Sequence, residues 1–196
     1  MEAVVWSDYL CPWCYLGRDR TQLLRALDVD VTPLPFELHP EIPLAGIPAK
    51  PSRYTRFIDM AEEMDVPFRA PDRVPNSKRA LASAEFVRHQ WPEAFTALDD
   101  ALFRAAWVDG LDIGDPEVID RLVDAAGADA SAVREIVDAG MMDQALAASR
   151  DAALDRGVSG TPAWLLDGRM LIPGLQDRSL FERCVERLRT RGATSS

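Results

Sequence analysis

Cysteine, histidine and positive charge are all scarce in this chain of 196 residues. It has three cysteines, two histidines, and 22 Lys and Arg residues against 32 Asp and Glu residues, which gives a net charge of −10. Binding to nucleic acid or to an anionic membrane depends on clustered Lys and Arg, so the deficit argues against both. We therefore expect neither a nucleic-acid nor a membrane partner, and we interpret the acidic balance as a solvated surface.

Long apolar runs are missing as well. No window reaches the roughly 18 uninterrupted apolar residues of a membrane-spanning helix. The N-terminus lacks the basic region and apolar core of a secretory signal, and Met1 stands directly before the first expected strand,. On these grounds we expect a cytoplasmic protein.

The small number of cysteines excludes a secreted disulfide framework, which needs several pairs. Cys11 and Cys14 form a Cys-x-x-Cys motif, whereas Cys184 stands alone in a later apolar segment. In a reducing compartment such a pair is typical of catalysis, redox sensing or metal binding. With 47% hydrophobic residues the chain can bury a core without the help of disulfides or metals,.

Both ends of the chain have patterns that predict alternating strands and helices. Pro33 and Pro35 place the second strand near a sheet edge or a bulge,, and Asp167-Gly168 predicts a hairpin turn,. The expected elements are a strand at 2–7, a helix at 11–27, a strand at 29–38, strands at 163–166 and 169–172, and a helix at 176–191,.

The apolar spacing between these two halves is helical for about a hundred residues. After a proline-rich loop at 39–51, six helices are expected to begin near residues 52, 77, 92, 116, 131 and 141,. The resulting order, β-α-β, a helical block, then β-β-α, is that of an α/β thioredoxin fold with a large all-helical insertion. We expect residues 1–48 and 158–196 to form the thioredoxin-like domain and residues 49–157 to form the insertion.

Cys11 is expected at the N-terminus of the first helix. Unpaired N–H groups and the helix dipole favour a thiolate there. Cys14 lies one turn inside on the same face, at about 5–6 Å between Cβ atoms, close to what a disulfide needs. Pro12 is tolerated in a first turn. These positions predict disulfide exchange in which Cys11 attacks a substrate disulfide and Cys14 resolves the mixed disulfide.

The alternative for the Cys-x-x-Cys motif is half of a zinc site, which needs two further ligands. Only Cys184, His39 and His89 are obvious candidates, and they are scattered along the chain. We therefore predict no metal, although a non-enzymatic redox- or zinc-sensing module stays open. Cys184 is interpreted as a buried core thiol because its helical neighbours are apolar.

Two further positions have more than one interpretation. Pro162 follows two glycines and precedes an apolar strand. This favours a tight turn, of which a cis bond is one form, but an ordinary loop proline fits equally well. Glu37 lies near the end of the second expected strand. It is either a buried carboxylate that relays protons to Cys14 or a solvent-exposed residue at the end of the strand.

Several motifs occur together in the order found in one known family. The sequence resembles the DsbA-like branch of the thioredoxin superfamily and, more narrowly, its FrnE-like subgroup. The segments that carry the resemblance are Asp8-Tyr9-Leu10-Cys11-Pro12-Trp13-Cys14-Tyr15-Leu16-Gly17, Phe36-Glu37-Leu38-His39-Pro40, Pro75-Asn76-Ser77, Asp112-Ile113-Gly114-Asp115-Pro116 and Val158-Ser159-Gly160-Thr161-Pro162.

The resemblance implies a dithiol–disulfide oxidoreductase with a thioredoxin fold. By that resemblance Pro162 is a cis-proline packed against Cys11, and Thr161 pairs its backbone with an extended substrate. Pro12 and Trp13 support substrate binding. The implied partner is a protein or small-molecule thiol or disulfide. No cofactor is expected beyond the redox-active disulfide, with glutathione as a possible reductant or co-substrate.

Pro12 and Trp13 differ from DsbA itself, because no histidine or other cation lies between the cysteines. Relatives with serine at the position of Cys11 include kappa-class glutathione transferases and hydroxychromene-carboxylate isomerases. A glutathione-dependent transferase or isomerase of small aromatic substrates is therefore the alternative function. The presence of both Cys11 and Cys14 favours redox chemistry. The sequence indicates neither the direction of electron flow nor the oligomeric state.

Overall fold

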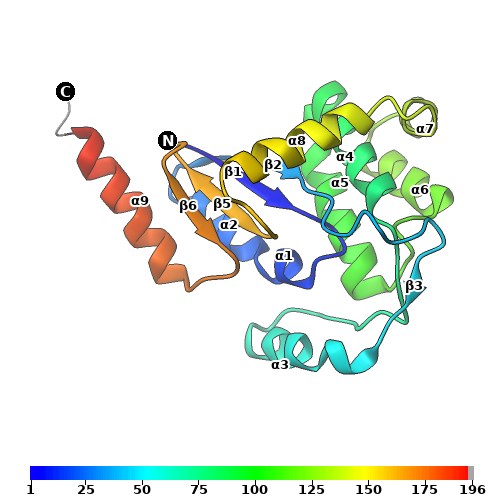
Figure 1. Cartoon of the computed structure of the whole chain (residues 1–196), viewed down its shortest axis with the longest axis horizontal. Coiled ribbons are helices and arrows are strands. Elements are labelled where there is room, and N and C mark those ends of the chain that lie inside the picture. The colour runs from blue at the N-terminus through cyan, green and yellow to red at the C-terminus, as the bar shows by residue number, and fades with distance from the viewer. Residues whose placement is uncertain (194–196) are drawn as a thin grey trace.

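The centre of the structure, a computed structural model, is a four-stranded sheet in the order β2-β1-β5-β6 (Figure 1). The structure describes residues 1–193, so the last three residues of the predicted 158–196 segment lie outside the described residues. β1 pairs in parallel with β2 and antiparallel with β5, which pairs antiparallel with β6. The strands are β1 (Glu2–Ser7), β2 (Asp30–Pro35), β5 (Ala163–Leu166) and β6 (Met170–Pro173).

Helices cover both faces of the sheet. Val5 packs in one cluster with Leu24 and Phe181, which belong to α2 (Arg18–Ala26) and α9 (Arg178–Ala193). The next residue, Trp6, packs in another cluster with Ala153 of α8 (Asp143–Asp155). Because successive strand residues point to opposite faces, this alternation places α2 and α9 beneath the sheet and α8 above it.

A second group of helices lies beside the sheet and has a core of its own (Figure 1). Its helices are α3 (Thr55–Glu63), α4 (Lys78–Gln90), α5 (Pro92–Arg104), α6 (Pro116–Ala126) and α7 (Ala130–Asp138), with a 3₁₀ turn η1 (Pro51–Arg53) and a π-helical turn η2 (Ala105–Asp109). Asp115 begins α6 as predicted, because its carboxylate accepts the Glu117 N–H at 2.8 Å,. Within residues 1–193, no helix is long and apolar enough to cross a membrane.

The predicted β-α-β and β-β-α halves are both present, and β2 lies at a sheet edge, as its prolines indicated. The division of the chain into residues 1–48 with 158–196 and 49–157 stays a prediction. α8 falls inside the expected insertion, yet it packs against the sheet through Ala153.

Two features differ from the expected elements. The single helix expected at 11–27 is two helices, α1 (Pro12–Leu16) and α2, which meet at Gly17. The loop expected at 39–51 contains β3 (Ile47–Pro48), which pairs with β4 (Arg73–Val74). A two-residue strand is too short to produce a periodic pattern, so the sequence carries no signal for this pairing.

Gly17, which lies between the two helices, has no room for a side chain. A Cβ at this position would lie 2.9 Å from the Trp13 carbonyl oxygen, 3.1 Å from the Trp164 ring and 3.4 Å from Pro162. We predict that Gly17→Ala lowers the free energy of unfolding by about 1–3 kcal/mol, measured by urea denaturation. Gly160→Ala is the matched control, because a Cβ there meets nothing within 4 Å. Equal stability of the two variants would contradict the packing argument.

Candidate active site

The turn that follows β1 places Cys11 at the start of α1. The Cys11 N–H donates to the Asp8 carbonyl at 3.1 Å, and Cys11 has extended backbone angles (φ −89°, ψ 114°) as the residue that caps the helix. Its own carbonyl accepts the N–H groups of Cys14 at 3.0 Å and Tyr15 at 3.2 Å. Pro12 occupies the first helical position, where no backbone N–H is needed,.

The two cysteines are free thiols with opposite properties. Cys11 is 2% exposed and Cys14 is 3% exposed. A hydrogen bond from the Cys14 thiol lowers the pKa of Cys11 and outweighs the effect of burial. Burial raises the pKa of Cys14 well above its ordinary value, and the interaction with Cys11 adds to that rise. Cys11 is therefore favoured as the thiolate, while Cys14 stays protonated.

Thr161 meets this pair from a loop 150 residues away in the chain. Its carbonyl accepts a hydrogen bond from the Cys11 thiol at 3.4 Å, and the Thr161–Pro162 peptide bond is cis. The Thr161 hydroxyl oxygen is buried and has no hydrogen-bond partner in the described part of the chain. It can donate to a sulfur anion, and this lowers the pKa of both cysteines,.

Asp8 is a completely buried carboxylate under the turn. Its oxygens accept the N–H groups of Leu10 at 3.1 Å and Leu38 at 2.8 Å. Burial raises the pKa of Asp8 to about 6, although the two amides act in the opposite direction. When ionised, Asp8 raises the pKa of Cys11 through its negative charge.

Glu37 is half-buried, and burial raises its pKa while the nearby cations Lys78 and Arg150 lower it. Its carboxyl also interacts electrostatically with the Asp8 carboxylate. A proton relay from Glu37 to Cys14 stays a prediction.

Cys11 opens into a cavity of about 490 Å³ that we name the Cys11 groove. Aromatic side chains form one wall, where the Trp13 and Phe57 rings pack edge to face with centroids 4.7 Å apart,. The groove is lined by Leu10, Cys11, Pro12, Trp13, Leu38, His39, Glu41, Ile42, Ile47, Arg53, Tyr54, Phe57 and Val74. A substrate that reaches Cys11 through this groove contacts Pro12 and Trp13.

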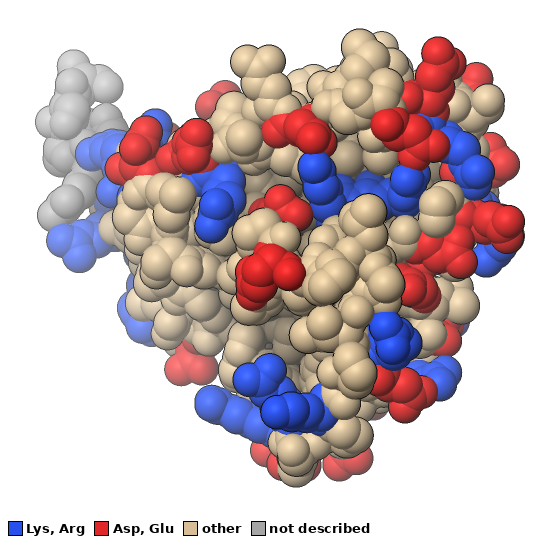
Figure 2. Space-filling model, turned by 45° about the vertical axis from the view of Figure 1, so that its right-hand side comes forward, with Lys and Arg blue, Asp and Glu red and all other residues tan. Residues whose placement is uncertain are grey.

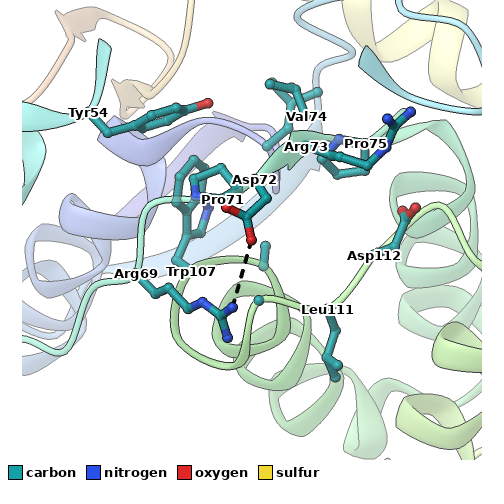
Figure 3. Close-up of a pocket in the computed structure, with 13 residues that line it drawn as sticks. Tyr54, Arg69, Pro71, Asp72, Arg73, Val74, Pro75, Trp107, Leu111 and Asp112 are labelled. Carbon is teal, nitrogen blue, oxygen red and sulfur yellow. Dashed lines mark ion pairs between the residues drawn. The ribbon is translucent and has the colours of Figure 1, made fainter. Parts of the chain in front are cut away.

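A second cavity, of about 180 Å³, shares part of its lining with the groove, and Figure 3 shows the residues that line it. Leu10, Tyr54 and Val74 line both cavities and therefore form the wall between them. The Trp107 ring and Arg69 are on the far side of that wall, and the second cavity contains no cysteine. Of these two cavities, the Cys11 groove is therefore the one that offers a thiol to a bound molecule.

Cys184 lies away from this site. It is buried on α9 in the cluster beneath the sheet, as predicted for a core thiol, whereas Cys11 and Cys14 belong to the helical core. Among residues 1–193, no group of three or more His, Cys, Asp or Glu side chains is arranged to hold a metal ion.

Asp8 and Tyr54 are parts of the site that the sequence analysis did not assign. The signal for Asp8 was available, since a carboxylate directly after a buried strand and three residues before Cys11 is placed close to the cysteine turn. Phe57 was expected to supply apolar lining to a groove beside Cys11, and it lines the Cys11 groove. Tyr54 gave only a helical pattern, because its contact with the Phe57 ring depends on tertiary packing.

Comparisons with known proteins agree with this geometry. The sequence profile of the DSBA-like thioredoxin domain family matches residues 3–186. The chain is 24% identical to a probable DsbA oxidoreductase, SCO1869 from Streptomyces coelicolor, with a TM-score of 0.83 over 95% of this chain and 89% of that one.

Two other solved structures have the same fold. A 2-hydroxychromene-2-carboxylate isomerase is 20% identical, with a TM-score of 0.77 over 100% of both chains. The cytosolic disulfide reductase DsbM from Pseudomonas aeruginosa, solved with GSH, is 19% identical, with a TM-score of 0.71 over 96% of this chain and 100% of that one. At these identities the likeness is one of fold, and it confirms the predicted thioredoxin fold with helices inserted.

The Thr161 hydroxyl provides a first test of the site. Because it lowers the pKa of Cys11, Thr161→Val should raise that pKa and slow alkylation of Cys11 by iodoacetamide at pH 7 about two- to tenfold. The measurement is the alkylation rate as a function of pH. Thr161→Ser keeps the hydroxyl and should behave like the wild type. An unchanged pH profile in Thr161→Val would exclude the hydroxyl as a thiolate donor.

Asp8 should make stability depend on pH. Its folded pKa of about 6 exceeds the unfolded value of about 4. The stability contributed by protonated Asp8 is therefore complete below pH 4 and is lost as the pH rises to 6, by about 3 kcal/mol in all. Urea unfolding at pH 4 and pH 7 should show this loss in the wild type but not in Asp8→Asn. Asp59→Asn, which removes an exposed carboxylate on α3, should keep the wild-type slope.

Proposed function

Because the chain belongs to the DSBA-like thioredoxin domain family, we propose that it is a thiol–disulfide oxidoreductase that works through Cys11 and Cys14. The observation that carries the proposal is the difference between two neighbouring buried thiols. The pKa of Cys11 is lowered and the pKa of Cys14 is raised at one site. The narrower FrnE-like assignment stays a prediction.

In the first step the Cys11 thiolate attacks one sulfur of a substrate disulfide. A bond forms between Cys11 and that sulfur, the substrate S–S bond breaks, and the other substrate sulfur leaves as a thiolate. The Thr161 carbonyl accepts a hydrogen bond from Cys11 while it is a thiol, and once Cys11 is a thiolate the Thr161 hydroxyl is the group that can donate to the attacking sulfur,. The substrate backbone pairs with the backbone of Thr161.

In the second step Cys14 loses its proton and attacks the Cys11 sulfur. The Cys11–Cys14 disulfide forms, the mixed disulfide breaks, and the second substrate thiolate leaves, so two electrons have passed to the substrate. Asp8, with a pKa of about 6, is ionised at pH 7 and can accept the Cys14 proton,. Glu37 is the second candidate. The reverse sequence oxidises a dithiol.

The substrate is a thiol or disulfide, carried by a protein or a small molecule. No cofactor is needed beyond the cysteine pair, and glutathione is a suitable reductant. The DsbM structure with GSH, which shares the fold, supports a role for glutathione. The cytoplasmic location predicted from the sequence suits a reductase of this kind.

The alternative is a glutathione-dependent isomerase or transferase of small aromatic substrates, because a hydroxychromene-carboxylate isomerase shares the fold. Such chemistry needs one thiol or hydroxyl at position 11 and does not need Cys14. A non-enzymatic redox- or zinc-sensing module is the remaining possibility. It would bind zinc stoichiometrically through the cysteine pair.

Single cysteine variants separate these functions. We predict that Cys11→Ser abolishes insulin-disulfide reduction with glutathione as the electron donor. Cys14→Ser should trap the mixed disulfide on Cys11, detected as an added mass. Cys184→Ser is the control and should retain activity, since that thiol lies in a different core cluster. Full activity in Cys11→Ser would overturn the proposal, and turnover of an aromatic substrate that survives Cys14→Ser would favour the isomerase.

A further inference from the structure

The Cys11 groove has two walls of different chemistry. One wall is aromatic and is formed by Trp13, Tyr54 and Phe57, with Arg53 beside them. On the other wall, the His39 Nδ1 atom lies 2.9 Å from the Glu41 carboxylate, so these two side chains are hydrogen-bonded to each other. The groove therefore presents to a molecule that approaches Cys11 an aromatic wall with a free positive edge, and an opposite wall on which the carboxylate already has a partner.

Arg53 and Arg56 form that positive edge. Arg53 lines the groove, and the Arg56 guanidinium lies 5.1 Å from the centre of the Trp13 ring. Both residues are exposed, and among residues 1–193 neither guanidinium has an ion pair or a hydrogen bond to the protein. Figure 2 shows Lys and Arg side chains gathered at the lower end of the molecule, where Figure 1 places α3, below a hollow in the surface. In a chain with a net charge of −10, unpaired cations at this position are suited to an anionic substrate,.

The size of the groove limits what it can hold. A cavity of about 490 Å³ falls in the range of small-molecule sites, about 300–1,000 Å³. Rings on a substrate can pack edge to face against Trp13 and Phe57, as these two rings already do with each other,. A carboxylate on that ring would then point toward the guanidinium groups of Arg53 and Arg56.

We infer that the Cys11 groove selects small disulfides and thiols whose sulfur is attached to an aromatic ring bearing a carboxylate. The inference rests on the proposed function, because it names the substrate that the Cys11 thiolate attacks. The ring packs on Trp13 and Phe57, the carboxylate pairs with Arg53 and Arg56, and the sulfur faces Cys11. The chemistry is the first exchange step: the Cys11–S bond forms, the substrate S–S bond breaks, and an aromatic thiolate leaves.

The test measures the rate of the first step with four disulfides of different chemistry. They are dithiobis-nitrobenzoate (aromatic and anionic), dithiodipyridine (aromatic and neutral), oxidised glutathione (a peptide with carboxylates but no aromatic ring) and cystamine (aliphatic and cationic). Each is reacted with the full chain carrying Cys14→Ser, so that the mixed disulfide on Cys11 accumulates. For each probe, the rate measured with a groove variant is compared with the rate measured with the unsubstituted groove. This comparison removes the differences in intrinsic reactivity between the probes.

The double variant Arg53→Gln, Arg56→Gln should lower the rate at which dithiobis-nitrobenzoate reacts with Cys11 about three- to tenfold, as expected for the loss of two exposed ion pairs with the substrate. High salt should remove this difference between the variant and the unsubstituted groove. Dithiodipyridine and oxidised glutathione should change by less than about twofold, and cystamine should not slow. Phe57→Leu should lower the reaction rates of the two aromatic probes, dithiobis-nitrobenzoate and dithiodipyridine. It should leave the rates of oxidised glutathione and cystamine unchanged. Arg183→Gln, Arg187→Gln on α9 removes the same charge from an exposed face remote from the groove, and should leave all four rates unchanged.

Three results would overturn the inference. If the groove variants change no rate, the aromatic wall and the arginines do not select the substrate. If the double arginine variant slows the reaction with oxidised glutathione as much as the reaction with dithiobis-nitrobenzoate, the arginines bind peptide carboxylates equally well. The proposed class of small aromatic substrates is then wrong. If the α9 control slows the anionic probe equally, only the overall charge matters. Failure of every probe to modify Cys11 would instead refute the proposed function, which keeps the two failures distinct.

Discussion

A carboxylate without access to solvent determines the shape of the active site. Asp8 accepts two backbone N–H groups, one from Leu10 in the cysteine turn and one from Leu38 after β2. The first bond fixes the turn that carries Cys11, and the second joins that turn to the segment that forms the far wall of the groove. Burial raises the pKa of Asp8 to about 6. The carboxyl that makes these two hydrogen bonds therefore changes its charge in the pH range where thiols react.

The cysteines lie at the boundary between two cores. Cys11 and Cys14 pack with the inserted helices, while the strand that precedes them, β1, packs with α2, α8 and α9. Trp107 of the inserted segment reinforces this boundary, since its indole N–H donates to the Tyr9 carbonyl at 2.8 Å. The helical segment is therefore part of the candidate site, and its packing sets the position of the Cys11 sulfur.

The sequence was sufficient for those features that depend on local chemistry. Asp115 and Pro116 begin a helix, Asp167-Gly168 closes a hairpin, and the strand that contains Pro33 lies at an edge, each as local preferences predict,. The features it could not supply depend on contacts between distant segments. The need for glycine at position 17 follows in part from the approach of Trp164, and the contact between Phe57 and Trp13 follows from the place of α3. The residue pattern of a single segment does not predict such contacts, because they depend on how distant segments pack together.

The wall shared by the two cavities makes substrate size adjustable with few sequence changes. Leu10, Tyr54 and Val74 line both the Cys11 groove and the neighbouring cavity, and Leu10 is next to Cys11 in the chain. A smaller side chain at position 74 would join the two spaces without touching either cysteine or the turn held by Asp8. Related proteins could thus diverge toward bulkier substrates through single substitutions in this partition, while the redox chemistry is inherited unchanged.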